Sequence, residues 1–197
     1  MTNIANILTM SRIAAIPLIA ALLFFDQPLL RWAAFALYAI ACITDFFDGY
    51  IARRMAQVSA LGRFLDPIAD KLLVGVTLFM LAALGRISAP AILPALVILA
   101  REILVSGLRE HLATLRVRLP VSRLAKWKTG IQMAAIVVLL IGDAGPAALS
   151  LRFIGEGLLW VAAALTLVTG YDYLRAGLVH INDDAPAIKT AKPSRAT

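Results

Sequence analysis

The sequence contains a single cysteine, Cys42, and only two histidines, His111 and His180. One thiol excludes a disulfide within the chain and a metal site built from cysteines alone. Cys42 lies in an apolar run, which indicates a role in packing. Both histidines lie far along the chain from the acidic cluster described below, and we expect them at the surface or at a membrane interface.

Charged residues are also scarce. They make up 16% of the 197 residues, hydrophobic residues make up 61%, and the mean hydropathy is +0.85. This composition is too apolar for an ordinary soluble domain. The formal net charge is nevertheless +7. In so apolar a chain, that excess of positive charge favours anionic lipid headgroups or a phosphate-bearing substrate as the partner. We expect no nucleic-acid partner.

Most of the sequence consists of long apolar stretches. Six can be read, at roughly 11–27, 31–52, 64–84, 89–109, 128–142 and 151–178, and several approach the roughly 20 residues that a helix needs to cross about 30 Å of hydrocarbon. We therefore predict an all-α integral membrane protein, a bundle of six transmembrane helices with a polar cavity at the cytoplasmic face. Residues 1–181 are assigned to this membrane domain, and the polar residues 182–197 to a disordered tail.

The basic residues are distributed unevenly between the ends of these helices. With the N-terminus in the cytoplasm, the outside loops contain only three of the 19 lysines and arginines, namely Arg31, Arg86 and Arg152. Such a bias follows the positive-inside rule. It predicts a multi-pass protein of the inner, cytoplasmic membrane, with both termini and the segment between the second and third helices on the cytoplasmic side.

Four aspartates flank that segment. Asp45 and Asp48 lie three residues apart near the end of the second stretch, and Asp66 and Asp70 lie four apart near the start of the third. Each pair shares one helix face, and the short connection makes the two helices antiparallel neighbours. Carboxylates converging in a low-dielectric site require protonation or divalent cations. Oxygen-only ligands favour Mg²⁺, Mn²⁺ or Ca²⁺ over zinc, and four carboxylates have room for two ions.

These aspartates belong to a motif that resembles the signature of the CDP-alcohol phosphatidyltransferase family. The matching residues are Asp45-x2-Asp48-Gly49-x2-Ala52-Arg53-x8-Gly62-x3-Asp66-x3-Asp70. A second stretch, Asn6-x2-Thr9-x2-Arg12, resembles a family segment that lies beside the nucleotide. Members of this family are membrane enzymes that move a phosphatidyl or related phosphoryl group from a CDP-linked donor to an alcohol and release CMP.

The resemblance implies a role for each matched residue. Asp45, Asp48, Asp66 and Asp70 are expected to bind Mg²⁺ or Mn²⁺, with Asp70 also acting as the base that accepts the hydroxyl proton of the acceptor. Apart from Ser59, which is expected to contact the CDP group, no Ser, Cys or His lies between Asp45 and Asp70, so we expect direct attack by the acceptor without a covalent enzyme intermediate. The residues expected to contact the CDP group are Asn6, Thr9, Asp45, Gly49, Ala52, Arg53, Ser59 and Gly62.

A second group of charges lies downstream. Arg101 and Arg109 are eight residues apart, so they point broadly the same way on a helix, and Lys126 and Lys128 open the fifth apolar stretch. We predict that these four cations bind a phosphate dianion of the acceptor. Together with Glu102 and Thr129, they occupy positions that resemble those of the family branch that uses sn-glycerol 3-phosphate, although glycine is expected where Ala125 stands.

Simpler interpretations exist for these charges. Arg101 can pair with Glu102 or with an aspartate of the cluster, and the two lysines can serve membrane topology alone. The four aspartates can instead be solvated at the membrane surface or paired with neighbouring cations. Those cations are Arg53, Arg54 and Arg63.

The function expected from motif and charges together is transfer of the phosphatidyl group of CDP-diacylglycerol to glycerol 3-phosphate, with release of CMP. A sibling enzyme that uses inositol phosphate, serine or phosphatidylglycerol as its acceptor stays open, since charge alone does not separate the phosphate-bearing acceptors. A divalent-cation transporter is a further alternative, although the acids lie near one membrane face. The family resemblance also implies a homodimer.

Overall fold

The computed structural model describes residues 4–55, 60–114 and 123–184, and over these ranges the chain is helical, with no strand. Two short 3₁₀ helices, η1 (Gly142–Ala144) and η2 (Ala147–Leu149), separate the last two α-helices. The α-helices are α1 (Ile4–Phe24), α2 (Pro28–Met55), α3 (Ala60–Ala83), α4 (Ala89–Thr114), α5 (Arg123–Ile141) and α6 (Leu151–Asp184). α6 thus extends three residues into the segment predicted as a tail, and the rest of that segment lies outside the described residues.

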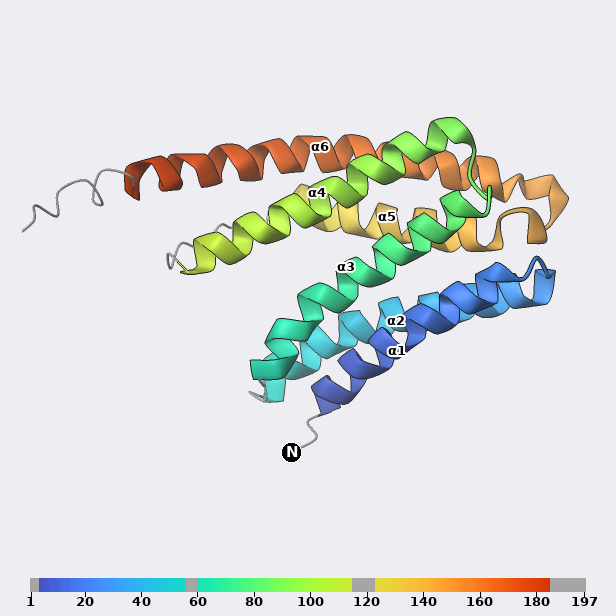
Figure 1. Cartoon of the computed structure of the whole chain (residues 1–197), viewed down its shortest axis with the longest axis horizontal. Helices are drawn as coiled ribbons and strands as arrows, with labels where there is room; N and C mark the ends of the chain where they lie inside the picture. Colours follow the sequence, from blue (N-terminus) through green and yellow to red (C-terminus); the bar gives the residue numbers. More distant parts are fainter. Residues whose placement is uncertain (1–3, 56–59, 115–122, 185–197) are drawn as a thin grey trace, which may run out of the picture.

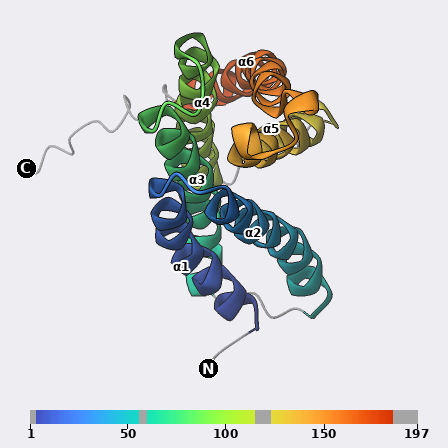
Figure 2. The same ribbon diagram turned by 90° about the vertical axis from the view of Figure 1, so that its right-hand side faces the viewer.

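The helices form two groups of three. α1 packs against α2 and α3, and α6 packs against α4 and α5, while contacts of α2 with α5 and of α3 with α4 join the groups (Figures 1 and 2). The α1–α2, α3–α4 and α5–α6 connections gather at one end, which we call the short-loop end. α2 ends and α3 begins at the opposite end, which we call the aspartate end.

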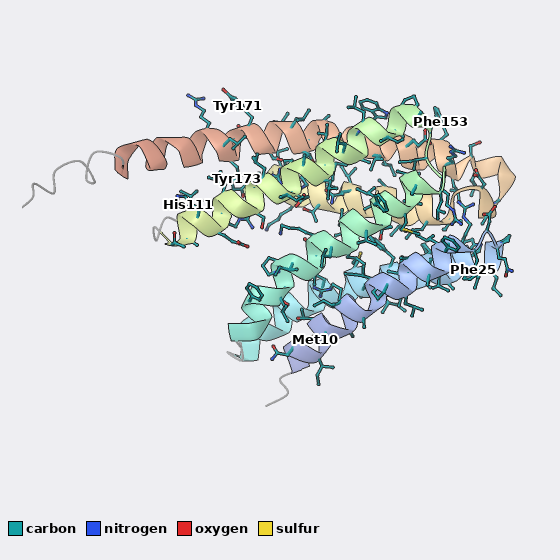
Figure 3. The ribbon with its side chains drawn as sticks, in the orientation of Figure 1. Met10, Phe25, His111, Phe153, Tyr171 and Tyr173 are labelled. Atoms are coloured by element: carbon teal, nitrogen blue, oxygen red, sulfur yellow. The ribbon has the colours of Figure 1, made fainter. Side chains whose placement is uncertain are left out.

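Five of the six α-helices are long and apolar enough to cross a membrane. Their surfaces agree with that assignment, because large apolar side chains such as Phe153 on α6 (80% exposed) face outwards, where water would oppose them (Figure 3). The all-α membrane architecture is confirmed. α3 is the exception among the six helices, since Asp66, Asp70 and Lys71 lie in its first half.

The core runs through both helix groups. Every α-helix contributes at least one fully buried apolar side chain, as illustrated by Ile19, Tyr38, Leu73, Ile98, Leu139 and Leu159. Small residues bring α5 and α6 together: a Cβ on Gly155 would lie 2.7 Å from the Leu139 side chain. Two single-residue predictions are confirmed, because Cys42 packs against Met133 and His111 is exposed at the end of α4. The side chain of His180 lies outside the described residues.

Two buried arginines stabilise helix ends at the short-loop end. Arg86 donates from Nη2 to the carbonyl oxygens of Leu23 (2.6 Å) and Phe25 (3.4 Å) at the end of α1, and Arg31 donates from Nε to the carbonyl oxygen of Leu140 (3.4 Å) in the last turn of α5. The last carbonyls of a helix lack intrahelical partners and attract cations. Burial, together with the nearby Arg31 charge, lowers the pKa of Arg86 from its ordinary value.

Gly142 makes room for one of these arginines. Its backbone has φ +46°, and a Cβ there would lie 2.6 Å from Arg31 Nη2. Any other residue would be strained by the backbone and would displace the arginine. The same end is tied together by Glu156, which accepts hydrogen bonds from Ser88 N (2.7 Å) and Ser88 Oγ (2.7 Å) and from Arg152 Nε (3.3 Å).

Candidate functional site

α1 lies against the aspartates of α2 and α3. Arg12 Nη1 is 2.8 Å from Asp45 Oδ1, and the Arg12 side chain is almost fully buried. One turn earlier on α1, Thr9 Oγ1 donates a hydrogen bond to Asp66 Oδ1. Residues three apart share a helix face, so the Asn6-x2-Thr9-x2-Arg12 spacing brings two polar groups of α1 to two different helices of the predicted site.

Asp70 lies further into the bundle than Asp66. Its carboxyl group is within electrostatic range of Asp45 and Glu102, and also of Lys71 and Arg12. α2, α3 and α4 therefore each bring a carboxylate to the same region, and α1 and α3 bring cations to it.

Carboxylate oxygens alone suit a hard divalent cation. The donor set on α2 and α3 thus fits Mg²⁺ or Mn²⁺. Among the side chains that the structure describes, however, no group of three or more His, Cys, Asp and Glu residues has metal-binding geometry. Asp45 and Asp66 instead contact Arg12 and Thr9, and the side chain of Asp48 lies outside the described residues.

Only part of the predicted CDP-contacting set can be placed. Asn6 is half-buried on α1, and Gly62 is buried near the start of α3. Gly49, Ala52 and Arg53 lie in the last turns of α2, but the structure describes only the helical backbone there, and Ser59 lies outside the described residues.

The downstream charges meet at Glu102. Its Oε1 atom accepts a hydrogen bond from Lys128 Nζ on α5 and lies 3.6 Å from Arg101 Nη1 on its own helix. Arg101 also donates from Nη2 to Thr169 Oγ1 on α6 (3.1 Å). Arg101 therefore fits both interpretations given above: it forms a salt bridge with Glu102, and it lies within a group of cations that converge on one region.

An aromatic ring on α6 holds the two arginines side by side. The Cζ atoms of Arg101 and Arg109 lie 5.8 Å and 5.6 Å from the ring centroid of Tyr173, which lies between α6 and α4 (Figure 3). A guanidinium at this distance is attracted to the face of the ring. Both arginines therefore share one anchor.

A small cavity of about 130 Å³ lies between α3 and α4, at the downstream charges and next in sequence to Asp70. Three of its lining residues are cations, from α3 and α4, and two are glutamates of α4. Asp70 lies in the sequence between Pro67 and Lys71, which both line the cavity. The lining residues are Pro67, Lys71, Arg101, Glu102, Val105, Ser106, Arg109 and Glu110.

Lys126 does not lie with the other predicted acceptor-site cations. It is exposed and lines a separate apolar hollow with Trp127, Gly130 and Ile131. Residues two apart on a helix point to different sides, so Lys126 faces away when Lys128 faces Glu102.

Four residues of this region were not predicted as site residues from the sequence. Lys71 lines the cavity, and its position next to Asp70 in the sequence was a usable signal. Glu102 was expected to pair with Arg101, but no role in the site was predicted for it. Thr169 and Tyr173 carried no signal, because their part depends on how α6 packs against α4.

Comparisons with known proteins agree with the motif. A family model described as CDP-alcohol phosphatidyltransferase matches residues 2–168. A CDP-diacylglycerol–glycerol-3-phosphate 3-phosphatidyltransferase of Rickettsia bellii is 50% identical over 174 residues, covering 88% of this chain and 94% of the relative. Proteins of the same name are 38% identical in Cereibacter sphaeroides (92% and 98% covered) and 40% identical in Pseudomonas fluorescens (92% and 93% covered). The chain therefore belongs to the CDP-alcohol phosphatidyltransferase family.

Proposed function

We propose that this protein transfers the phosphatidyl group of CDP-diacylglycerol to sn-glycerol 3-phosphate, giving phosphatidylglycerol phosphate and CMP. The observation that carries the proposal is the adjacency of two chemistries: an aspartate set suited to phosphoryl transfer, and a cavity lined by Lys71, Arg101 and Arg109. A phosphate dianion is the acceptor group that such a cavity favours. Relatives named for this reaction, at 38–50% identity, support the same choice.

In the proposed reaction, the acceptor hydroxyl oxygen attacks the phosphorus that carries diacylglycerol. The bond from that phosphorus to the bridging oxygen of the pyrophosphate breaks, and its electron pair leaves with CMP. Asp70 accepts the hydroxyl proton. Mg²⁺ or Mn²⁺ held by Asp45, Asp48, Asp66 and Asp70 would supply positive charge to the pyrophosphate and the departing CMP. Arg101 and Arg109 hold the acceptor phosphate so that its hydroxyl reaches Asp70.

The donor lipid also has a place in this proposal. A groove of about 360 Å³ between α3 and α4 is almost wholly apolar. It contains Leu72, Val76 and Phe79, and it shares Lys71 with the cation-lined cavity. We propose that an acyl chain of CDP-diacylglycerol occupies this groove, since the shared lysine places the groove beside the cavity proposed for the acceptor phosphate.

The proposal includes an orientation. Placing the aspartate end in the cytoplasm gives water-soluble glycerol 3-phosphate access to the cavity and leaves Arg31, Arg86 and Arg152 on the opposite side. We propose the inner membrane as the site of action and residues 1–181 as the catalytic unit. The homodimer implied by the family resemblance stays a prediction.

The decisive experiment is an acceptor panel. Purified protein in detergent would receive CDP-diacylglycerol, Mg²⁺ or Mn²⁺, and one of glycerol 3-phosphate, inositol phosphate, serine or phosphatidylglycerol, with CMP release as the readout. We expect release with glycerol 3-phosphate. Release only with another alcohol would assign the protein to a sibling activity.

A further inference from the structure

We infer that Glu102 is an internal competitor of the acceptor phosphate. Its carboxylate neutralises Lys128 and Arg101 while the acceptor site is empty, and the acceptor phosphate displaces it from them. This inference rests on the proposed function for the identity of the acceptor. It concerns a residue that stands at a family-like position in the sequence but for which no role beyond pairing with Arg101 was predicted.

The burial of Lys128 requires a counter-ion. Its side chain is 3% exposed, and a buried ammonium without a counter-ion is strongly destabilising. Within the described part of the chain, Glu102 is the carboxylate that contacts Lys128. The same carboxylate group, 16% exposed, also lies beside Arg101. Glu102 therefore occupies the position between these cations that an anionic ligand would take.

The neighbouring donors are only partly used by Glu102. Arg101 Nε is buried and has no hydrogen-bond partner among the described residues. Arg109 makes no ion pair within the described part of the chain and rests on Tyr173 at the same cavity. One carboxylate thus leaves two guanidinium groups incompletely matched.

A phosphate dianion matches them better. It carries more charge and more acceptor oxygens than a carboxylate, and an arginine binds it through two parallel hydrogen bonds. In the cavity it can engage Arg101 and Arg109, which both line it, and it reaches Lys128 once Glu102 has moved away, whereas Glu102 contacts only Arg101 and Lys128. Part of the binding free energy of the phosphate is consequently used to displace Glu102, which weakens the apparent affinity for the acceptor.

The test is kinetic. Glu102→Gln keeps the size of the side chain and removes the competing charge. With CDP-diacylglycerol held saturating, we expect the KM for glycerol 3-phosphate to fall by about threefold or more, with a smaller change in kcat. Inhibition by inorganic phosphate should strengthen by a similar factor. An unchanged or raised KM would overturn the inference and leave Glu102 as a residue that only positions Lys128 and Arg101.

Two further variants make the result specific. Glu102→Asp keeps the charge on a shorter side chain, so both contacts weaken and the KM should fall by less than in Glu102→Gln. A raised KM in Glu102→Asp would contradict competition even if Glu102→Gln failed to fold. Glu110→Gln removes the same charge from an exposed position lining the same cavity, and we expect a smaller change than at Glu102.

A binding readout separates this inference from the proposed function. Without ligand, Glu102→Gln should unfold at a lower temperature than wild type, because Lys128 loses its counter-ion. Inorganic phosphate should then raise its unfolding temperature by more than it raises that of wild type. If wild type releases CMP only with another alcohol, the proposed function fails. If wild type uses glycerol 3-phosphate but the phosphate-induced shift in the variant is no larger, this inference alone fails.

Discussion

The two ends of the molecule use cations in different ways. At the short-loop end, Arg31 and Arg86 are buried and directed to backbone carbonyl oxygens that end α5 and α1. At the aspartate end, Lys128 is buried and Arg101 is partly buried against the carboxylate of Glu102, and Arg101 lines a cavity together with Lys71, the residue after Asp70. A buried arginine is therefore no sign of catalysis by itself. What distinguishes the aspartate end is that its cations face a space that a ligand can enter.

Cavity size alone would point to the short-loop end. The short-loop end contains a larger cavity, about 520 Å³, against about 130 Å³ beside Asp70. Its charged lining residues are Asp143, Arg152 and Glu156, and the single cation among them, Arg152, pairs with both acids. Arg31 and Arg86 do not line it. The smaller cavity contains more cations than acids. Charge that the chain does not itself neutralise is the better guide to a substrate anion.

The difference between the two ends predicts that the largest loss of activity follows substitution of Asp70. Asp70→Asn should lower kcat by about 10² to 10⁴-fold, because the proposed base is lost, while CDP-diacylglycerol binding and the unfolding temperature change little. CMP release and thermal unfolding in detergent measure the two effects. Asp172→Asn, an exposed change on α6, is the matched control. Substantial residual turnover in Asp70→Asn would refute the base role.

The short-loop end should show the reverse pattern. Arg86→Met removes the donor to Leu23 and Phe25, so their carbonyl oxygens at the end of α1 lose a partner. We expect a loss of about 2 kcal/mol of stability, seen as a lower unfolding temperature, with the KM for glycerol 3-phosphate unchanged. Arg152→Met breaks a more exposed ion pair with Glu156 and should cost clearly less. If Arg86→Met raised the KM for glycerol 3-phosphate and left stability unchanged, the two ends would not differ in the way proposed.

Arg109 tests the cavity side of the comparison. Arg109→Ala should raise the KM for glycerol 3-phosphate by about tenfold, since one guanidinium of the Tyr173-anchored pair is lost. The unfolding temperature should stay close to that of wild type, because Arg109 is exposed. Arg175→Ala, an exposed arginine of α6, serves as the control. An unchanged KM would place the acceptor phosphate elsewhere.

Much of the architecture could be predicted because it depends on local properties. Apolar length gives the helices, and the spacing of Asp66 and Asp70 gives a shared face. The acceptor site depends on how helices pack, which spacing does not reveal. Tyr173 meets Arg101 only because α6 lies along α4. Asp66, Asp70 and Lys71 make α3 too polar to be counted among the membrane-spanning helices. The same charges include two of the predicted site residues.

Lys126 gives the smallest and most discriminating prediction. Sequence proximity grouped it with Lys128, but the structure separates them, with Lys128 buried against Glu102 and Lys126 exposed beside Trp127. Lys126→Ala should therefore change the KM for glycerol 3-phosphate by less than about twofold, as expected for an exposed, screened charge, whereas Lys128→Ala should raise it strongly. Measuring both KM values at low and high salt separates direct contact from long-range attraction. A strong rise in Lys126→Ala at both salt concentrations would mean that α5 rotates to bring Lys126 into the cavity when the acceptor binds.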